Sequence, residues 1–259
     1  MKLNIKRILR QIPILKRIYT SISIKIFKLS KKKYFLVNFM GINFKLNIKE
    51  PIDKSILLFD YYENEQIETS IDLISKNKID IFFDIGANCG IYSLIFANKF
   101  NNLQIYSFEP IVSSLKKFAE NIKINKNSKN IKLYNFGLSN ENTILKMKAL
   151  VKNDHIQLGG FGVLNKGDNL ENKFLTEANF KKGDDCFKFK KKTIFLKIDV
   201  EGHELQVLDG LTELFNDNKI ILQIEILPEN IEIVKKKLLK FKFIKFKKIG
   251  FDYYFTNKN

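Results

Sequence analysis

The sequence predicts an α/β protein whose core is a mostly parallel sheet with helices on both faces. After residue 79, short apolar runs rich in Ile and Phe alternate with segments of helical period. Such alternation builds parallel strands joined by right-handed crossovers. A glycine-containing turn follows the first of these runs, and two closing strands indicate an antiparallel edge. The 259 residues suffice for one such domain with an additional segment.

Each element follows from its local pattern. Two strands within 34–48 turn near Gly41, and a helical pattern over 55–75 precedes the core. The core is expected to begin with strand 79–85, helix 91–99, strand 103–108, helix 111–124 and strand 131–136. An irregular region over 139–192 follows, and then strand 194–199, helix 203–215, strand 219–226, helix 229–240 and strands 241–249 and 251–256.

The chain divides into a basic N-terminal segment, residues 1–33, and a single domain over 34–259, with a hairpin and helix at 34–75 and a core at 79–259. The segment's apolar residues recur at three- and four-residue spacing, and its basic residues fall largely elsewhere. Such a helix can lie on an anionic membrane surface or cover the domain or a partner subunit. Because all three arginines of the chain, Arg7, Arg10 and Arg17, lie here, we slightly favour the membrane.

Composition narrows the class of protein. The chain is 45% hydrophobic with 24 Phe, which is typical of a globular protein, and it has no apolar run of about eighteen residues. Cys89 and Cys186 are expected to be free thiols of a cytoplasmic protein, since no secretory signal is apparent. The net charge of +17 suggests binding to nucleic acid or to anionic lipid. However, Lys supplies nearly all of it, whereas Arg is favoured where phosphate is recognised bidentately.

The segment IFFDIGANCGIYSLIFA, residues 81–97, predicts a cofactor site. A buried strand ends at Asp84, and Gly86 and Gly90 bracket a tight turn, where glycine lets a ligand approach the backbone. A dinucleotide fingerprint would instead be GxGxxG, with amides placed for a pyrophosphate. A carboxylate at the head of the turn repels phosphate and attracts a cation. S-adenosylmethionine fits, because it carries an ammonium and a sulfonium but no phosphate.

Two further turns extend this site. Glu109 ends the second strand, in IYSFEP, nineteen residues after Gly90, where an acidic side chain can accept the ribose hydroxyls. Taken alone, Glu109 could be an ordinary helix-start carboxylate near Pro110, but its combination with the Asp84 loop favours the cofactor role. The turn after the third strand, which includes Gly137, is the expected place for the adenine edge, and Asn88 lies within the first turn.

The fourth strand ends in a cluster of acidic residues that indicates the reacting side. Asp199, Glu201 and His203 follow one another at alternate positions and are the candidate bases for a hydroxyl acceptor. The alternative for Glu201 and Glu204 is stabilisation of a helix N-terminus, and His203 could equally be a helix-start residue with no role in chemistry. Lys197 shares a sheet face with Asp199, so we predict that it pairs with a carboxylate here, since a lone buried lysine is costly. Mg²⁺ prefers oxygen ligands, so Asp199, Glu201 and Glu225 could hold one, but the spacing does not demand a metal.

The motifs DIGANCGIYSL, SFEP, NFGLSN and LKIDVEGHELQVLDGL, in this order, resemble the FkbM-type methyltransferases over about residues 61–225. The resemblance implies a class I, Rossmann-like methyltransferase fold with a mostly parallel seven-stranded sheet and an antiparallel edge. It also implies S-adenosylmethionine-dependent O-methylation of sugar or polyketide-type hydroxyls, often in surface-polysaccharide pathways.

Residue roles carry over from the resemblance position by position. Asp84, Gly86, Gly90 and Glu109 correspond to cofactor positions, and Asp199 and Glu201 to the signature. The stretch YYENE resembles a further family element, with Glu63 or Glu65 as its acidic position near the cofactor. The family pattern varies where His203 stands.

The region 139–192 is expected to recognise the acceptor. Its glycine-bearing stretch 155–169 could close over substrate, with Asp154 and His155 as candidate contacts. An exposed loop with no such role fits the pattern equally well. We therefore predict an O-methyltransferase acting on a sugar hydroxyl in glycan or surface-polysaccharide biosynthesis. One alternative is an RNA methyltransferase, although base-modifying enzymes usually hold the base against an aromatic side chain and the fourth strand ends without one. Another is a non-catalytic, cofactor-binding scaffold of a glycan pathway.

Overall fold

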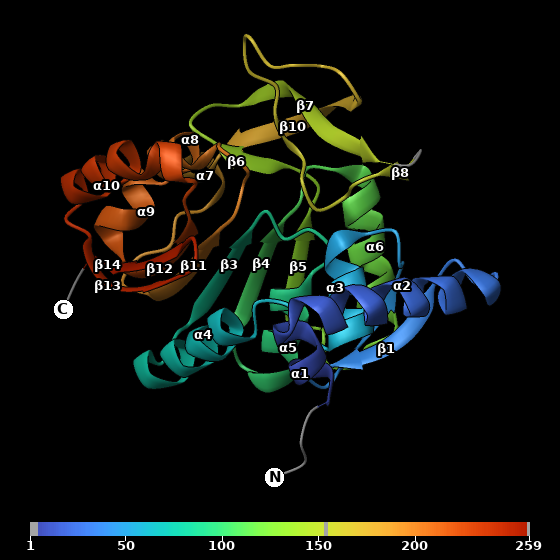
Figure 1. The fold of residues 1–259 in the computed structure, drawn as a ribbon. Helices are drawn as coiled ribbons and strands as arrows, with labels where there is room; N and C mark the ends of the chain where they lie inside the picture. Colours follow the sequence, from blue (N-terminus) through green and yellow to red (C-terminus); the bar gives the residue numbers. More distant parts are fainter. Residues whose placement is uncertain (1–4, 153–154, 258–259) are drawn as a thin grey trace. The chain divides into compact units, whose positions relative to one another are not determined.

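The computed structural model describes residues 5–152 and 155–257, and the chain forms two compact units, 1–64 and 65–259 (Figure 1). The N-terminal unit contains α1 (Ile5–Gln11), α2 (Pro13–Leu29), β1 (Phe35–Phe39), β2 (Ile42–Leu46) and α3 (Pro51–Phe59). Proline at the first position of α2 has no amide hydrogen to continue α1, so the two helices separate at this point. β1 and β2 form the expected antiparallel hairpin, with Met40 and Gly41 both at positive φ in the turn.

The expected helix over 55–75 is instead two helices. α3 ends at Phe59, and Asp60 adopts the left-handed conformation with φ of 52°, which stops the helix. α4 (Asn64–Asn77) then begins after a short turn.

The larger unit is built on a seven-stranded sheet, which confirms the expected fold class. The strand order is β13-β14-β12-β11-β3-β4-β5, and β14 runs antiparallel to both of its neighbours while the remaining pairs are parallel. The strands are β3 (Ile81–Ile85), β4 (Gln104–Phe108), β5 (Ile131–Tyr134), β11 (Thr193–Ile198), β12 (Lys219–Glu225), β13 (Ile244–Ile249) and β14 (Asp252–Thr256).

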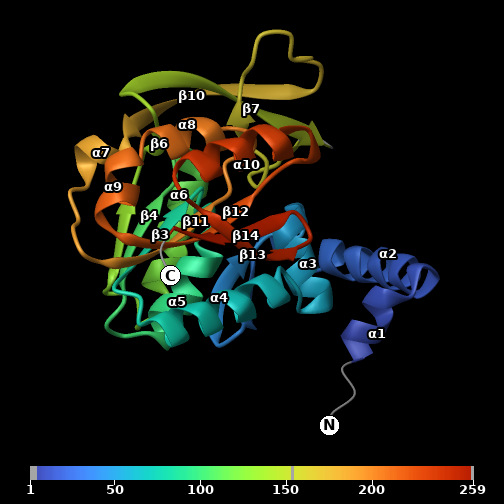
Figure 2. The same ribbon diagram turned by 90° about the vertical axis from the view of Figure 1, so that its left-hand side faces the viewer.

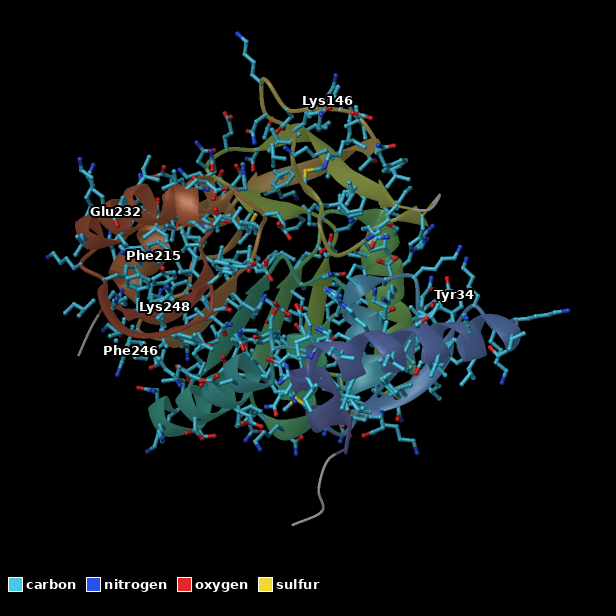
Figure 3. All side chains as sticks on the ribbon, viewed as in Figure 1. Tyr34, Lys146, Phe215, Glu232, Phe246 and Lys248 are labelled. Atoms are coloured by element: carbon cyan, nitrogen blue, oxygen red, sulfur yellow. The ribbon has the colours of Figure 1, made fainter. Side chains whose placement is uncertain are left out.

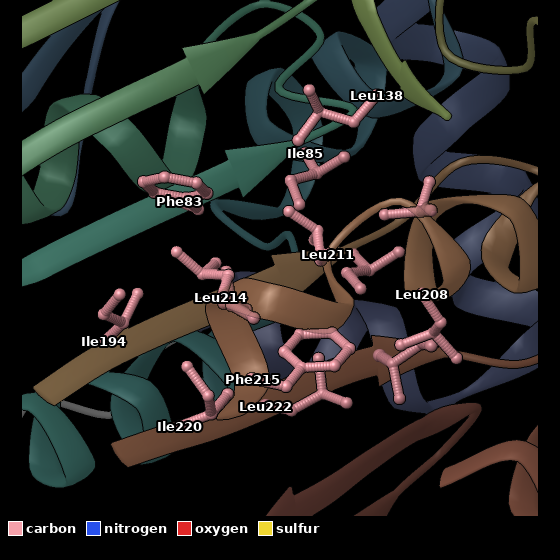
Figure 4. Packing of buried hydrophobic residues seen from close by; sticks show 14 of the residues in the cluster. Phe83, Ile85, Leu138, Ile194, Leu208, Leu211, Leu214, Phe215, Ile220 and Leu222 are labelled. Carbon is pink, nitrogen blue, oxygen red and sulfur yellow. The ribbon is translucent and has the colours of Figure 1, made fainter. Parts of the chain in front are cut away.

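Helices cover both faces of this sheet (Figure 2). On one side are α7 (Gly183–Cys186), α8 (Glu204–Asp209), α9 (Thr212–Asp217), the 3-10 turn Pro228–Asn230 and α10 (Ile231–Lys240). On the other are α4, α5 (Ile91–Lys99) and α6 (Val112–Lys123). Figure 4 shows Leu211, Leu214 and Phe215 packed against the strand residues Ile220 and Leu222, all within one buried cluster. Each such side chain contributes about 1.5–3 kcal/mol on burial.

The same packing sets which side chains point outward. Phe215 is 2% exposed and points into the layer between helices and sheet, whereas Glu232 of α10 points to solvent (Figure 3). On the opposite face, the ring centroids of Phe82 and Phe96 lie 4.9 Å apart, which joins β3 to α5. The glycine turn between these elements is therefore held on a rigid base.

The expected helix over 203–215 is broken into α8 and α9. A Cβ at Gly210 would lie 1.8 Å from the carbonyl oxygen of Ser139, so the chain passes this strand too closely to carry a side chain. After the break, buried Asp184 caps α9, accepting the amide hydrogens of Glu213 and Leu214 at 3.0 Å each.

The region 139–192 is regular, contrary to the expectation from the sequence. β6 (Gly137–Ser139), β7 (Thr143–Lys152), β8 (His155–Ile156), β9 (Gly162–Val163) and β10 (Lys173–Lys182) form a second sheet in the order β6-β10-β7-β8, with β9 paired to β7. Its small apolar cluster of Ile111, Met147, Ala178 and Phe180 lies on one face. The other face carries lysines together with the exposed side chains of Ile144, Leu150 and Leu175. Figure 1 shows this sheet over the ends of β3, β4 and β5.

Candidate active site

A row of polar side chains crosses the central sheet near the carboxyl ends of its parallel strands. The register pairs Ser107 with Asp84, Asp84 with Lys197, Lys197 with Gln223 and Gln223 with Tyr254. Residues paired in register point to the same face. The face covered by α4 and α5 therefore holds a polar band in an otherwise apolar sheet.

Lys197 forms the ion pair that the sequence predicts. Its Nζ lies 2.8 Å from Oδ2 of Asp199 and 4.8 Å from the ring centroid of Tyr92. Burial by itself would raise the pKa of Asp199, but the charge of Lys197 and hydrogen bonds from Glu225 and Lys197 outweigh it, so the pKa lies below its ordinary value. Asp199 is therefore an anion at neutral pH.

Glu225 lies beside Asp199 and shares a proton with it. Burial and the neighbouring Asp199 charge raise the pKa of Glu225 to about 9. At neutral pH Glu225 therefore keeps its proton and donates it in the hydrogen bond to Asp199. The pair carries one negative charge, which Lys197 balances.

Asp84 is bonded inside the turn that it begins. It is 1% exposed, and its Oδ2 accepts a 2.6 Å hydrogen bond from the Ser93 hydroxyl, whose oxygen lies 2.7 Å from that of Ser107. Burial raises the pKa of Asp84, and Lys197 opposes that rise. Asp84 thus holds the start of α5 to the sheet.

The two glycines of the turn are required by packing within the protein. Both have positive φ, 84° at Gly86 and 83° at Gly90. A Cβ at Gly86 would lie 1.8 Å from the carbonyl oxygen of Asp199, and one at Gly90 would lie 2.1 Å from the ring of Phe118. From the sequence, these glycines are predicted to allow close approach by a ligand. The structure adds that they also let the turn contact β11 and α6.

Glu109 ties three turns together. Its Oε2 accepts the amide hydrogen of Asn88 and its Oε1 that of Ile111, each at 2.8 Å. The Asn135 side-chain amide donates to the carbonyl oxygen of Glu109 at 3.1 Å. Burial raises the pKa of Glu109 to about 7, and the charges of Asp84 and Asp199 add to the rise.

Gly137 begins the strand that follows this third turn. A Cβ there would lie 2.3 Å from the ring of Phe180, its partner in β10. The glycine therefore allows β6 to pack against an aromatic ring, and its predicted place at the adenine edge remains a prediction.

Glu201 is the exposed carboxylate of the cluster. It has a φ of 52° and Gly202 one of 100°, which makes the sharp turn between β11 and α8. Loss of water around the carboxylate, together with the charges of Asp199 and Glu204, raises the pKa of Glu201 to about 7. Glu204 is instead buried and accepts the amide hydrogen of Gly202 at 2.8 Å. Of the two acids, Glu201 is the one placed to exchange protons with a ligand.

His203 lies apart from this carboxylate cluster. It is 6% exposed, its Nε2 lies 2.9 Å from the Ser139 hydroxyl, and its ring centroid lies 5.3 Å from that of Phe180. Burial lowers the pKa of His203 to about 4, so the ring is neutral at physiological pH. The geometry supports a structural contact with β6 and β10 more than a role as base.

The second sheet reaches the end of β11. A Cβ at Gly162 would lie 3.0 Å from the carbonyl oxygen of Glu201, and the Ser114 hydroxyl of α6 donates to the carbonyl oxygen of Leu158 at 3.5 Å. The segment between them therefore spans from α6 to the Glu201 turn. His155 lies in β8, paired with Lys152, whereas Asp154 lies outside the described residues. Glu63 belongs to the N-terminal unit, so its cofactor role stays a prediction.

Sequence reasoning missed the polar network behind the ion pair. The Gln223 side-chain amide donates to Asp252 at 2.8 Å and to the Tyr92 hydroxyl at 3.2 Å, while its oxygen accepts from Ser70 at 2.7 Å. The available signal was Gln223, a neutral polar residue at the centre of the apolar strand ILQIEI. Among described residues, no three His, Cys, Asp or Glu side chains are grouped to hold a metal, so Asp199, Glu201 and Glu225 do not form the ligand set considered above. Neither Cys89 nor Cys186 forms a disulfide, as expected.

The comparisons with known proteins identify the family. The model of the methyltransferase FkbM domain matches residues 84–245, more than half of the chain. The chain belongs to the FkbM methyltransferase family. The enzyme is thus a class I methyltransferase that depends on S-adenosylmethionine. No curated protein sequence matches it.

Solved structures also resemble this FkbM methyltransferase. The precorrin-6y C5,15-methyltransferase of Geobacter metallireducens is 13% identical, with 76% of this chain and 88% of that chain covered and a TM-score of 0.43. The human methyltransferase 10 domain containing protein is 11% identical, with 84% and 87% covered and a TM-score of 0.47. The M. jannaschii TYW2 in complex with AdoMet is 11% identical, with 87% and 84% covered and a TM-score of 0.43.

The chemistry of the site fits this methyl donor. Glu109 has a raised pKa in part because Asp84 and Asp199 repel its negative charge, which means that the edge has an excess of carboxylates. A ligand with an ammonium and a sulfonium group relieves that repulsion, and a phosphate would increase it. That Asp84, Asn88, Glu109 and the glycines hold the donor remains a prediction.

Proposed function

We propose that this FkbM methyltransferase methylates a hydroxyl group of a sugar in glycan or surface-polysaccharide biosynthesis. The observation that carries the proposal is Glu201, an exposed carboxylate whose pKa of about 7 suits a base at neutral pH. A sugar hydroxyl is a poor nucleophile and gains most from such a base. The neutral ring of His203 is engaged with Ser139 and does not compete for this role.

Each residue has a defined part in the proposed reaction. The bound donor supplies an electrophilic methyl group. The acceptor oxygen forms a bond to that methyl while the carbon–sulfur bond breaks, and Glu201 takes the hydroxyl proton. Asp199, held by Lys197 and Glu225, fixes the loop that carries Glu201. Alignment contributes roughly 7–11 kcal/mol and the base a further 10²–10⁴-fold.

The second sheet supports an acceptor of this kind. Its β9 segment lies against the Glu201 turn, so an acceptor bound under it would meet the base. An RNA backbone is less suited, because the carboxylates around Glu201 repel phosphate.

The test uses labelled S-adenosylmethionine with fractionated cell glycans and, separately, with cellular RNA. We expect label in a glycan fraction as an alkali-stable methyl ether, and strong loss of transfer in Glu201→Gln. Glu68→Gln, which alters an exposed carboxylate of α4, is the matched control and should transfer normally. Label in RNA and none in glycan would overturn the proposal, and donor binding without transfer to any fraction would favour a scaffold.

A further inference from the structure

We infer that α1 and α2 bind the surface of an anionic lipid bilayer. The inference concerns the N-terminal unit alone and does not depend on the acceptor. It begins from the distribution of charge: thirteen of the 45 Lys and Arg residues, and none of the 28 Asp and Glu residues, occur before Glu50. This stretch therefore carries +13 of the net charge of +17.

α2 exposes an apolar stripe along its length. Ile14, Ile18, Ile22 and Ile26 follow one another four residues apart and are 71%, 52%, 54% and 62% exposed, and Leu29 at the end is 80% exposed. Side chains at this spacing lie on one side of a helix. An exposed stripe of large aliphatic residues is unusual on a surface that meets only water.

A different side of α2 already packs against its own unit. Tyr19 contacts Phe59 with ring centroids 5.8 Å apart, and Phe27 contacts Phe35 at 4.6 Å. Ser23, midway between these two aromatic residues, is buried. The isoleucine stripe is therefore not the surface by which the helix is held, and it remains available to an apolar partner.

Basic groups gather beside the stripe where α1 meets α2. A pocket of about 540 Å³ is lined by Arg10, Pro13, Lys16, Arg17, Thr20 and Ser21. None of these lining residues is acidic, and two hydroxyls accompany three cations. Arg10 also stacks over the Tyr61 ring at 3.3 Å, which holds its guanidinium in place. Fixed cations and hydroxyls are the groups that bind a phosphate.

An anionic bilayer offers the complement of both features, since it presents phosphates above hydrocarbon. An amphipathic helix with a basic polar face lies in this interface with its apolar side at the acyl boundary. A nucleic acid would satisfy the cations but leave the isoleucines in water. A second protein copy would cover the isoleucines but bring together two surfaces that are both strongly positive. Among described residues no helix is long and apolar enough to cross a bilayer.

Sedimentation of the full-length protein with vesicles tests the inference. We expect binding to phosphatidylcholine vesicles that contain 40% phosphatidylglycerol, at least tenfold weaker binding to pure phosphatidylcholine, and a steep loss in 0.5 M NaCl. Lys16→Gln with Arg17→Gln should weaken binding about fivefold for each charge removed. The matched change Lys236→Gln with Lys240→Gln on α10 should leave binding unchanged.

A second set of variants tests the contribution of the apolar stripe. Ile18→Glu with Ile22→Glu should lower vesicle binding at least tenfold, and Ile233→Glu with Leu239→Glu, exposed positions of α10, should not. Because the chain has no Trp, the tryptophan fluorescence of Ile22→Trp reports directly on the surroundings of the apolar stripe. Its fluorescence should shift to the blue with anionic vesicles, whereas that of Leu239→Trp should not. Three results would overturn the inference: no vesicle binding, binding to RNA alone, or a dimer that the Ile18 and Ile22 changes dissociate without any vesicle binding.

Discussion

At the scale of single residues, the site is a set of carboxylates whose proton affinities are pushed apart. Asp199 is held as an anion by Lys197, Glu225 keeps its proton to a pKa of about 9, and Glu201 and Glu109 titrate near 7. Groups with similar intrinsic acidity thus acquire different tasks from their surroundings. Two consequences of this separation are measurable.

The rate of methyl transfer should follow a bell-shaped pH profile. Glu201 must lose its proton to act as base, which sets an acid limb near 7. Glu225 must keep its proton to bond Asp199, which sets an alkaline limb near 9. Glu201→Gln should lower kcat by about 10²–10⁴-fold and remove the acid limb. In Glu225→Gln the side-chain amide can still donate a hydrogen bond to Asp199, so this variant should keep most of the transfer rate near pH 7.5 and lose only the alkaline limb. Profiles with both limbs unchanged in the two variants would contradict these assignments.

Donor binding should depend on the protonation of Glu109. With a pKa of about 7, Glu109 is mostly charged at pH 8 and mostly neutral at pH 6, so affinity for the cationic donor should fall about tenfold over that range. Glu109→Gln should bind the donor on the order of 10- to 100-fold more weakly at pH 8 and show little pH dependence. Titration calorimetry measures both effects, with Glu177→Gln as a control on an exposed carboxylate. If the donor affinity of the wild-type protein did not change with pH, Glu109 would not interact with the positive charge of the donor.

At the scale of elements, buried side chains from distant segments hold the short helices around the site. α9 has only six residues and begins without a cap of its own, so its first amides depend on Asp184. The start of α8 likewise depends on His203, which joins it to β6 and β10. The His203 contacts adjoin the loop that carries the carboxylate cluster, whereas the Asp184 cap lies further along the chain, at the start of α9.

Removing the Asp184 cap should destabilise the protein. Asp184→Ala leaves two amide hydrogens of α9 without their acceptor in a buried place, and we expect a loss of about 2–4 kcal/mol in the free energy of unfolding. Asp185→Ala, at the exposed neighbour, should cost less than about 1 kcal/mol. Urea unfolding of the two variants makes the comparison. Equal losses would show that burial of the segment, and not the cap, supports α9.

His203 should make the protein acid-sensitive. The pKa of His203 is about 4 in the folded protein, against an ordinary value of 6.5 for an exposed histidine, so between these values the unfolded chain binds more protons. This contribution to stability is therefore complete above pH 6.5 and is lost as the pH falls toward 4, by about 3 kcal/mol in all. Relative to His203→Gln, the wild-type protein should lose stability over that window in urea unfolding at each pH. A constant difference between the two proteins would contradict the buried neutral ring.

At the scale of the whole molecule, the sequence predicts the sheet and the ion pair but not the connections between distant segments. Lys197 and Asp199 stand two residues apart at the end of β11, so alternation and the cost of a lone buried lysine predict that Lys197 pairs with a nearby carboxylate, which is Asp199. The bond from Gln223 to Asp252 requires the strand order, which no local pattern contains. The partners of Glu109 are backbone amides, which every residue except proline offers. The second sheet was missed because its lysine-rich strands lack the β-branched runs that mark a strand.

The second sheet, over the strand ends, is connected both to the turn predicted to bind the donor and to the turn that carries Glu201. β6 follows directly on the Asn135 turn that is bonded to Glu109, and β10 pairs with β6 on one side and β7 on the other. β9, paired to β7, lies against the backbone of Glu201. An acceptor that orders this layer would also order the donor's turn. By thermodynamic reciprocity, each substrate should then tighten the other's binding by the same factor.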